Sequence, residues 1–267
     1  MSKRFDGRYV FVGGLHRSGT SLLTRLIAQH PNVAAIEASP APENEGCYLQ
    51  GAIPHTARHG RPGHFATDPE QHLVEGCRFD SRDTALRIGD DWDRWFPPGG
   101  AWRVEKSPVN LCRTRLYQQL FPMSQFILIL RHPSIVAAAH AKWVDAPHED
   151  LIGYALAGYE RAVSDTAYLH AAMIIRYEDM VHSPASLFAA IDSFLGLEVH
   201  ERAFDLRDGN AEYPDTPPVT DDAERRMKQF GYHGPAEVGA FTPIVHHPLR
   251  EIREATGSCF AKGSNPW

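Results

Sequence analysis

Several features that define other protein classes are scarce in this sequence of 267 residues. It has only four cysteines, Cys47, Cys77, Cys112 and Cys259, and their wide spacing excludes a C-x-x-C zinc motif and a disulfide framework. No apolar run approaches the roughly 18 residues that a transmembrane helix needs. The 15 histidines are spread along the chain rather than paired at the spacing of metal ligands. We therefore expect a soluble protein with free thiols and no metal site.

An excess of positive charge is also absent. The 27 Lys and Arg residues are outnumbered by 33 Asp and Glu residues, and the formal net charge is -6. This balance argues against nucleic acid as a partner, because sequence-independent binding needs many cations to neutralise phosphates. Residues 1–8 are polar and run directly into an apolar, strand-like segment, without the successive n-region, h-region and small-residue cleavage site of a secretory signal, so we expect a cytoplasmic protein.

Short apolar segments alternate with helical patterns along the chain. The predicted strands are residues 9–14, 33–36, 102–105, 125–130 and 173–177. The predicted helices are residues 21–29, 84–95, 109–120, 133–143, 151–168, 184–195 and 221–230. This order predicts an α/β fold of the P-loop type, a three-layer αβα arrangement with a mainly parallel sheet and ligands at the carboxyl ends of the strands.

The length favours one domain over residues 1–267. Residues 38–100 are rich in Pro, Gly and His, and we interpret them as a loop-rich insertion that binds the acceptor. Residues 207–267 form either a lid or a surface wrap. His246 and His247, which precede a proline, are interpreted as a surface turn.

The segment from Gly14 to Ser21 lies between a predicted strand and a predicted helix, where backbone N–H groups and the helix dipole favour an anion. It matches the nucleotide-hydrolase pattern G-x-x-x-x-G-K-[ST] except at Thr20, which occupies the position of the lysine. The cation of this loop is Arg17 instead. The strand over residues 125–130 ends in an arginine rather than in a metal-binding aspartate. Both departures predict phosphate binding without a magnesium site.

The run Arg17-Ser18-Gly19-Thr20-Ser21 resembles the sulfotransferase superfamily, in which R-S-G-T-[ST] or K-x-G-T-[ST] binds the 5′-phosphosulfate end of 3′-phosphoadenosine 5′-phosphosulfate (PAPS). The resemblance implies that these five residues bind the donor, that Arg17 also acts in catalysis, and that 3′-phosphoadenosine 5′-phosphate (PAP) is the product.

Three later blocks resemble the same superfamily. Arg131, which follows the apolar strand, resembles the arginine that binds the donor's 3′-phosphate, and Tyr177 in Y-E-D-M resembles the tyrosine that packs near the nucleotide. Lys106 in E-K-S-P resembles the catalytic lysine of the glycan and tyrosylprotein members. The superfamily commonly has a serine where this chain has Ala139, and Ser134 is the residue that we expect to contact the phosphate instead.

Transfer to a hydroxyl group needs a general base. The N-E element that contains Glu45 resembles that of the heparan-type sulfotransferases, which implies that Glu45 is the base. Glu37, nearer to the second predicted strand, is the second candidate, and His55 and His64 are the third. The hydroxyl, or less favourably the amine, belongs to a small-molecule, glycan or lipid acceptor that the sequence does not identify.

Two other function classes compete with this interpretation. A P-loop small-molecule kinase would use the same loop, but it should carry the lysine and the metal-binding carboxylate that are missing here. A non-catalytic phosphonucleotide-binding module would not need Arg17, Lys106 and an acidic residue together. Several aromatic residues line either an acceptor pocket or the core, namely Trp92, Trp95, Trp102, Trp143, Phe65, Phe79 and Phe96.

Overall fold

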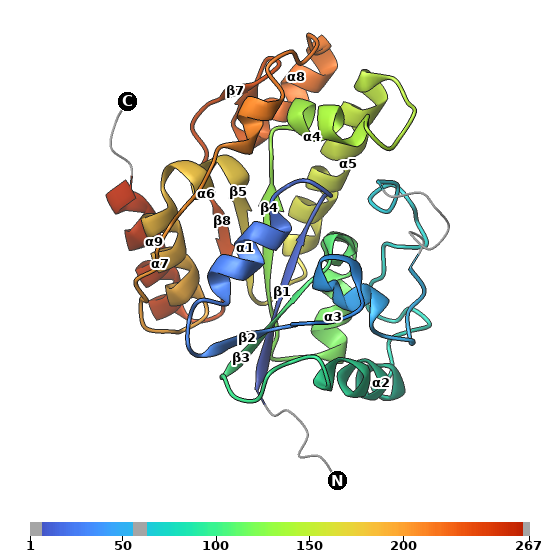
Figure 1. The fold of residues 1–267 in the computed structure, drawn as a ribbon, viewed down its shortest axis with the longest axis vertical. Coiled ribbons are helices and arrows are strands. Elements are labelled where there is room, and N and C mark those ends of the chain that lie inside the picture. The colour runs from blue at the N-terminus through green and yellow to red at the C-terminus, as the bar shows by residue number, and fades with distance from the viewer. Residues whose placement is uncertain (1–6, 56–62, 264–267) are drawn as a thin grey trace.

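A six-stranded sheet forms the centre of the computed structural model, which describes residues 7–55 and 63–263 (Figure 1). The strand order is β2-β3-β1-β4-β5-β8. All neighbours are parallel except β8, which pairs antiparallel with β5. The strands are β1 (Arg8–Gly14), β2 (Val33–Ala35), β3 (Trp102–Lys106), β4 (Gln125–Leu130), β5 (Ala172–Arg176) and β8 (Ile244–His246). The predicted, mainly parallel sheet is thus confirmed.

Helices follow most of the parallel strands, as expected for right-handed crossover connections. They are α1 (Thr20–Ile27), α2 (Arg82–Asp93), α3 (Thr114–Leu120), α4 (Pro133–His140), α5 (His148–Thr166), α6 (Tyr177–His182), α7 (Pro184–Phe194), α8 (Asp221–Met227) and α9 (Arg250–Gly263). Short 3₁₀ helices are η1 (Pro42–Asn44), η2 (Gly46–Tyr48), η4 (Pro108–Cys112), η5 (Gly209–Glu212) and η6 (Lys228–Phe230), and a small hairpin pairs β6 (Tyr232–His233) with β7 (Glu237–Val238).

The central strands bury side chains on both faces, which is why they are almost continuously apolar. In β1, Val10 and Val12 pack with helices α1, α6 and α7, whereas Tyr9 and Phe11 face a cluster that includes α2 and α3. Leu128 of β4 packs on that second face with α4 and α5. The sheet is therefore the middle of three layers, and the predicted αβα class is confirmed.

The segment predicted as one helix over residues 109–120 is divided in two. The 3₁₀ helix η4 precedes α3, and Arg113 between them has a non-helical φ of -120°. The physical reason is that Asn110 donates its side-chain amide to the backbone oxygen of Val12 and to Glu105, which ties this turn to the end of the sheet. The predicted helix over residues 133–143 ends early, at His140.

The C-terminal part is more ordered than its composition suggests. The interpretation of His246 as part of a surface turn is wrong, because His246 pairs with Ala172 in the antiparallel strand β8. Helix α9 then packs against α7. Residues 264–267 of this tail and residues 56–62 of the predicted insertion lie outside the described residues, as do residues 1–6, in which no export signal was expected.

Candidate active site

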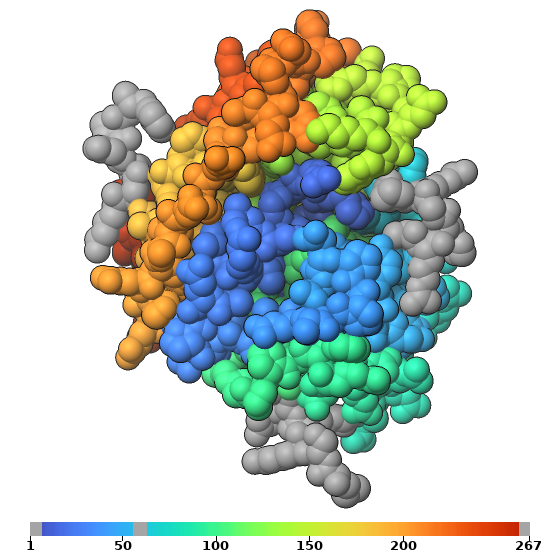
Figure 2. Space-filling model, viewed as in Figure 1, coloured from blue at the N-terminus to red at the C-terminus, as the bar shows by residue number. Residues whose placement is uncertain are grey.

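Polar groups gather where four neighbouring parallel strands end. The loop over residues 14–20 joins β1 to α1, Lys106 is the last residue of β3, Arg131 follows β4, and Tyr177 follows β5. The register pairs Val12 with Lys106, so the lysine lies beside the beginning of the loop. Carboxyl ends of parallel strands are the usual position of ligand sites in such sheets. Figure 2 shows a hollow on this face, between the dark-blue segment that contains α1 and the lighter blue residues that follow β2.

The loop between β1 and α1 has the geometry of an anion site. Gly19 has a φ of 92°, and a Cβ added there would lie 2.7 Å from the Tyr177 ring, so this position requires glycine. Helix α1 begins at Thr20 without a side-chain cap, which leaves its first N–H groups available to an anion. Ser18 is fully buried beneath the loop, and Ser21 is exposed on the first turn.

Arg17 differs from the rest of this loop. Its φ of 66° is left-handed, and its exposed guanidinium lies over the Trp143 ring, 4.6 Å from the ring centroid. Such a contact is a cation–π interaction, which orders the side chain near the mouth of the site without neutralising it. The expected cation is therefore present at the exposed side of the loop.

Arg131 is held in one orientation by groups from three parts of the chain. Its Nη1 donates to the backbone oxygen of Arg17 at 2.6 Å, and its Nε donates to Asn210 Oδ1 at 2.8 Å. The guanidinium also stacks on Tyr177, 4.4 Å from the ring centroid. The Arg131 guanidinium thus lies directly against the β1–α1 loop.

Several buried polar atoms have no hydrogen-bond partner among the described residues, including His16 Nδ1 and the Ser18 hydroxyl of this loop, and two of them lie in residues 131–134, directly after β4. These two are Arg131 Nη2 and the hydroxyl oxygen of Ser134, which is 0% exposed on the first turn of α4. A buried polar atom without a partner is costly, and a phosphate would satisfy both of these donors. Ala139, which stands where the superfamily commonly has serine, is fully buried in α4. The residues present therefore fit a second phosphate next to the first.

Tyr177 links this region to the C-terminal tail. Its hydroxyl group donates to the backbone oxygen of Arg207 at 3.1 Å and accepts the N–H of Gly209 at 2.8 Å. A Cβ at Gly209 would lie 3.0 Å from that hydroxyl and 3.1 Å from Arg131 Nη2. The tail thus passes within contact distance of the unpartnered guanidinium nitrogen, in orange above α6 in Figure 1.

Lys106 and Glu45 form a buried ion pair. The distance between Lys106 Nζ and Glu45 Oε1 is 3.2 Å, and the two residues are 4% and 7% exposed. Burial raises the pKa of Glu45 above its ordinary value, and the charge of Lys106 partly opposes that shift. A carboxylate with a raised pKa is a stronger proton acceptor, as general-base catalysis requires.

A fully buried carboxylate, Glu105, holds the backbone next to Glu45. Glu105 Oε1 accepts the N–H of Gly46 at 3.0 Å and the hydroxyl of Ser107 at 2.6 Å, and Oε2 accepts the Asn110 amide at 2.7 Å. The Ser107 hydroxyl in turn accepts the N–H of Cys47 at 2.9 Å. Burial raises the pKa of Glu105, and the hydrogen bonds from Ser107 and Asn110 oppose the rise. The end of β3 therefore fixes the position from which Glu45 projects.

The other candidate bases occupy different surroundings. Glu37 and His64 are exposed, whereas His55 is buried with its ring 5.0 Å from that of Tyr48. His16 of the β1–α1 loop was not a candidate, but it lies in this region. Burial and then the neighbouring His140 lower the pKa of His16 to about 3. Of the predicted bases, Glu45 is the one that the structure pairs with Lys106.

The aromatic residues divide between the core and the site. Trp92 and Trp102 are completely buried in the hydrophobic core, and Phe96 is 6% exposed there. Trp143 is 44% exposed and lies against Arg17. Of the two alternatives left open by the sequence, Trp92 and Trp102 follow the core alternative.

Other site types are not found in the part of the chain that the structure describes. Residues 7–55 and 63–263 contain no group of three or more His, Cys, Asp or Glu side chains that could hold a metal ion. Within the same ranges no helix combines the length and apolarity needed to cross a bilayer. The four cysteines are free thiols.

Besides His16, the residues Glu105 and Asn210 contribute to the site and were not predicted. Glu105 stands directly before Lys106 in the E-K-S-P run, so its place at the carboxyl end of a buried strand was a signal that could have identified it. Asn210 lies in a polar tail without periodicity, and only the folded chain brings it to Arg131.

Comparisons with known proteins concern the family and the fold of this chain. A sequence profile described as "Sulfotransferase family" matches residues 9–201. The solved sulfotransferase domain from the curacin biosynthetic pathway is 14% identical, with a TM-score of 0.51 over 86% of this chain and 99% of that chain. A sulfotransferase from Mycobacterium avium is 15% identical, with a TM-score of 0.49 over 96% of this chain and 76% of that chain. At these identities the likeness to the curacin domain concerns the fold alone. No curated protein sequence matches the chain.

Proposed function

Because the chain belongs to the sulfotransferase family, we propose that it transfers the sulfuryl group of PAPS to a hydroxyl group of a small-molecule, glycan or lipid acceptor. The observation that carries this proposal is the Arg131 guanidinium, whose Nη1 donates to the backbone oxygen of Arg17 in the β1–α1 loop and whose buried Nη2 has no partner, together with the unpartnered Ser134 hydroxyl on the first turn of α4. A nucleotide with phosphate groups at both the 5′ and the 3′ position would use the loop and these donors together. A nucleoside triphosphate has no group for the second position.

In this proposal the loop residues Arg17, Ser18, Gly19, Thr20 and Ser21 bind the 5′-phosphosulfate end. Arg131 and Ser134 bind the 3′-phosphate, and Tyr177 packs beside the nucleotide. The N–H groups at the start of α1 supply fixed positive ends of dipoles, and Arg17, which lies over the Trp143 ring, supplies a positive charge. In this proposal the positive charge that binds the donor comes from N–H groups and arginine side chains, and no residue of the site is assigned to a metal ion.

Sulfuryl transfer resembles phosphoryl transfer, in which charge accumulates on the leaving oxygen and the protein contributes mainly by positioning and electrostatic stabilisation. Lys106 and Arg17 stabilise that charge. Glu45 accepts the proton of the acceptor hydroxyl as it attacks. The ion pair with Lys106 keeps the buried Glu45 ionised between turnovers, which a carboxylate with a raised pKa requires. We propose that this chemistry takes place in a single cytoplasmic domain over residues 1–267, with residues 38–100 contributing to acceptor binding and residues 207–267 closing the donor side.

Calorimetric titration with PAP, in the presence of EDTA, tests the donor assignment. Wild type is compared with Arg131→Ala and with Arg250→Ala, a matched control at an exposed arginine of α9. We expect metal-independent binding that weakens by about 10- to 100-fold in Arg131→Ala, because a charge-assisted hydrogen bond is lost, and that is unchanged in Arg250→Ala. Binding of ATP with Mg²⁺ in preference to PAP would overturn the proposal and support a kinase.

A second measurement tests the transfer itself. Labelled PAPS is incubated with pools of phenols, sterols, fatty alcohols and oligosaccharides, and the labelled product identifies the acceptor class. Transfer to any hydroxyl-containing pool that is lost in Lys106→Ala would support catalysis. PAP binding without transfer to any pool would instead favour a non-catalytic phosphonucleotide-binding module.

A further inference from the structure

Asn210 makes two hydrogen bonds that connect the C-terminal tail to the strand ends. Its Oδ1 accepts Arg131 Nε at 2.8 Å, and its Nδ2 donates to Glu178 Oε1 at 3.1 Å. Both ends of the side-chain amide are thus used, and neither the amide nor the guanidinium can rotate without losing a bond. Asn210 belongs to η5, whose first turn is capped by Asp208, which accepts the N–H of Asn210 at 2.9 Å.

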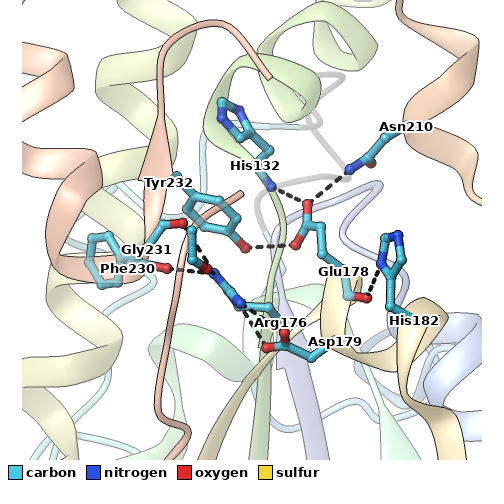
Figure 3. A network of polar contacts seen from close by, with 10 residues as sticks. His132, Arg176, Glu178, Asp179, His182, Asn210, Phe230, Gly231 and Tyr232 are labelled. Atoms are coloured by element: carbon cyan, nitrogen blue, oxygen red, sulfur yellow. Dashed lines mark hydrogen bonds and ion pairs between the residues drawn. The ribbon is translucent and has the colours of Figure 1, made fainter. Parts of the chain in front are cut away.

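Glu178, the far partner of Asn210, is itself fixed. It is 1% exposed, and it accepts the backbone N–H of His132 and the hydroxyl of Tyr232, each at 2.9 Å. Figure 3 shows these groups converging on the carboxylate from β4–α4, from the tail and from β6. A buried carboxylate with this many donors is a rigid anchor, because any movement would leave charged oxygens unsatisfied.

The same contacts determine which guanidinium nitrogen of Arg131 has no hydrogen-bond partner. Of its three nitrogens, Nε is used by Asn210 and Nη1 by the backbone oxygen of Arg17, which leaves Nη2 without a partner. The neutral amide of Asn210 orients the guanidinium but does not cancel its charge. A carboxylate in the same place would form an ion pair with Arg131 and compete with a phosphate for it.

We propose that Asn210 is a positioning residue for Arg131, and that this arrangement is the source of the preference for a 3′-phosphorylated nucleotide over one without the 3′-phosphate. The Glu178 carboxylate holds Asn210, Asn210 holds the Arg131 guanidinium, and Nη2 is presented to the 3′-phosphate. This inference rests on the proposed function, since it assumes that PAPS is the donor.

The test measures the ratio of the affinities for two nucleotides, with and without a 3′-phosphate. A residue with a merely structural role would not change this ratio. Calorimetry measures the dissociation constants of PAP and of adenosine 5′-monophosphate, which lacks the 3′-phosphate, for each variant. In Asn210→Ala we expect PAP binding to weaken by about 10- to 100-fold while binding of the monophosphate stays unchanged. In Asn210→Asp, which keeps the shape of the side chain, we expect at least as large a loss for PAP, because the new carboxylate competes with the phosphate for Arg131 and cannot donate to Glu178.

Glu212→Gln is the matched control, because Glu212 is an exposed residue of the same 3₁₀ helix, and its affinity ratio should equal that of wild type. Unchanged binding of the monophosphate shows that each variant is folded. A wild-type ratio in both Asn210→Ala and Asn210→Asp would overturn this inference and leave the proposed function standing. A wild-type protein that binds PAP no more tightly than the monophosphate would overturn both.

Discussion

Lys106 Nζ lies 3.2 Å from Glu45 Oε1, and both side chains are almost completely buried. The two residues are far apart in the sequence. They meet because Lys106 is the last residue of β3, and the segment that follows the neighbouring strand β2 contains Glu45. A buried ion pair contributes little to stability on balance, because desolvation of both charges offsets their attraction. The proposed roles of Lys106 and Glu45 rest on the position of this pair at the carboxyl end of β3, where Lys106 is paired in register with Val12 of β1.

Replacing Lys106 with alanine should reduce kcat by about 100- to 1000-fold, because the lysine acts on charge that develops in the transition state. The affinity for PAP, measured by calorimetry, should change much less. Lys106 also lowers the pKa of Glu45, so its loss should move the acidic limb of the pH profile to higher pH. Lys228→Ala, at an exposed lysine, is the control. An unchanged kcat in Lys106→Ala would contradict the assigned role.

Replacing Glu45 with glutamine should lower kcat/KM by about 100- to 10,000-fold, the usual contribution of a general base. In wild type kcat/KM should fall as the pH falls through the raised pKa of Glu45, since the protonated carboxyl cannot accept a proton. That limb should be missing in Glu45→Gln and retained in Glu37→Gln. A large loss in Glu37→Gln or His55→Gln instead would show that one of these residues is the base.

Replacing Gly46 with alanine should displace Glu45, the proposed base, without changing the Glu45 side chain itself. A Cβ there would lie 2.6 Å from Glu105 Oε1, so the bond between that oxygen and the Gly46 N–H cannot persist unchanged. We expect kcat to fall by at least about tenfold and the free energy of unfolding to fall by about 1 to 3 kcal/mol, with PAP affinity retained. Gly89→Ala in α2, where nothing lies within 4 Å, should instead stabilise the protein by about 0.5 to 1 kcal/mol. Equal kinetics for Gly46→Ala and wild type would contradict the positioning role of Glu105.

Acidification should destabilise the protein through its buried histidines. Burial lowers the pKa of His140 to about 4 from an ordinary value of 6.5, so the folded state keeps this ring neutral. Between pH 6.5 and about pH 4 the unfolded chain binds the proton and the folded chain does not, so stability decreases as the pH falls in that range. From pH 7 to pH 5 the contribution of His140 is on the order of 1 to 2 kcal/mol.

Urea unfolding at several pH values measures this effect in wild type and in His140→Gln, whose amide can still donate to the backbone oxygen of His16. The slope of the unfolding free energy against pH should be smaller in the variant. Identical slopes would show that His140 titrates alike in the folded and unfolded states.

The elements near the β1–α1 loop could be predicted from local pattern because local chemistry dictates them. Position 19 requires glycine because of its left-handed φ and its close contact with Tyr177. The apolar side chains of β4 point to both faces of the sheet, and both faces are buried only when the strand lies between two layers of helices. The strand β8 could not be predicted in the same way. It is three residues long, and its existence depends on the exposed edge of β5 rather than on its own composition.

The same distinction between local pattern and long-range contacts applies to the candidate site. Local sequence pattern predicted the αβα fold and the glycine-containing turn between β1 and α1, and it placed Lys106 and Arg131 where β3 and β4 end, because the carboxyl ends of parallel strands lie at one edge of the sheet. Only the tertiary structure brought Glu45 to Lys106 and Asn210 to Arg131. Glu45 lies between the short 3₁₀ helices η1 and η2, and Asn210 lies in η5. The course of these short segments is set by long-range hydrogen bonds, such as the one from the Gly46 N–H to Glu105, and not by any local periodicity.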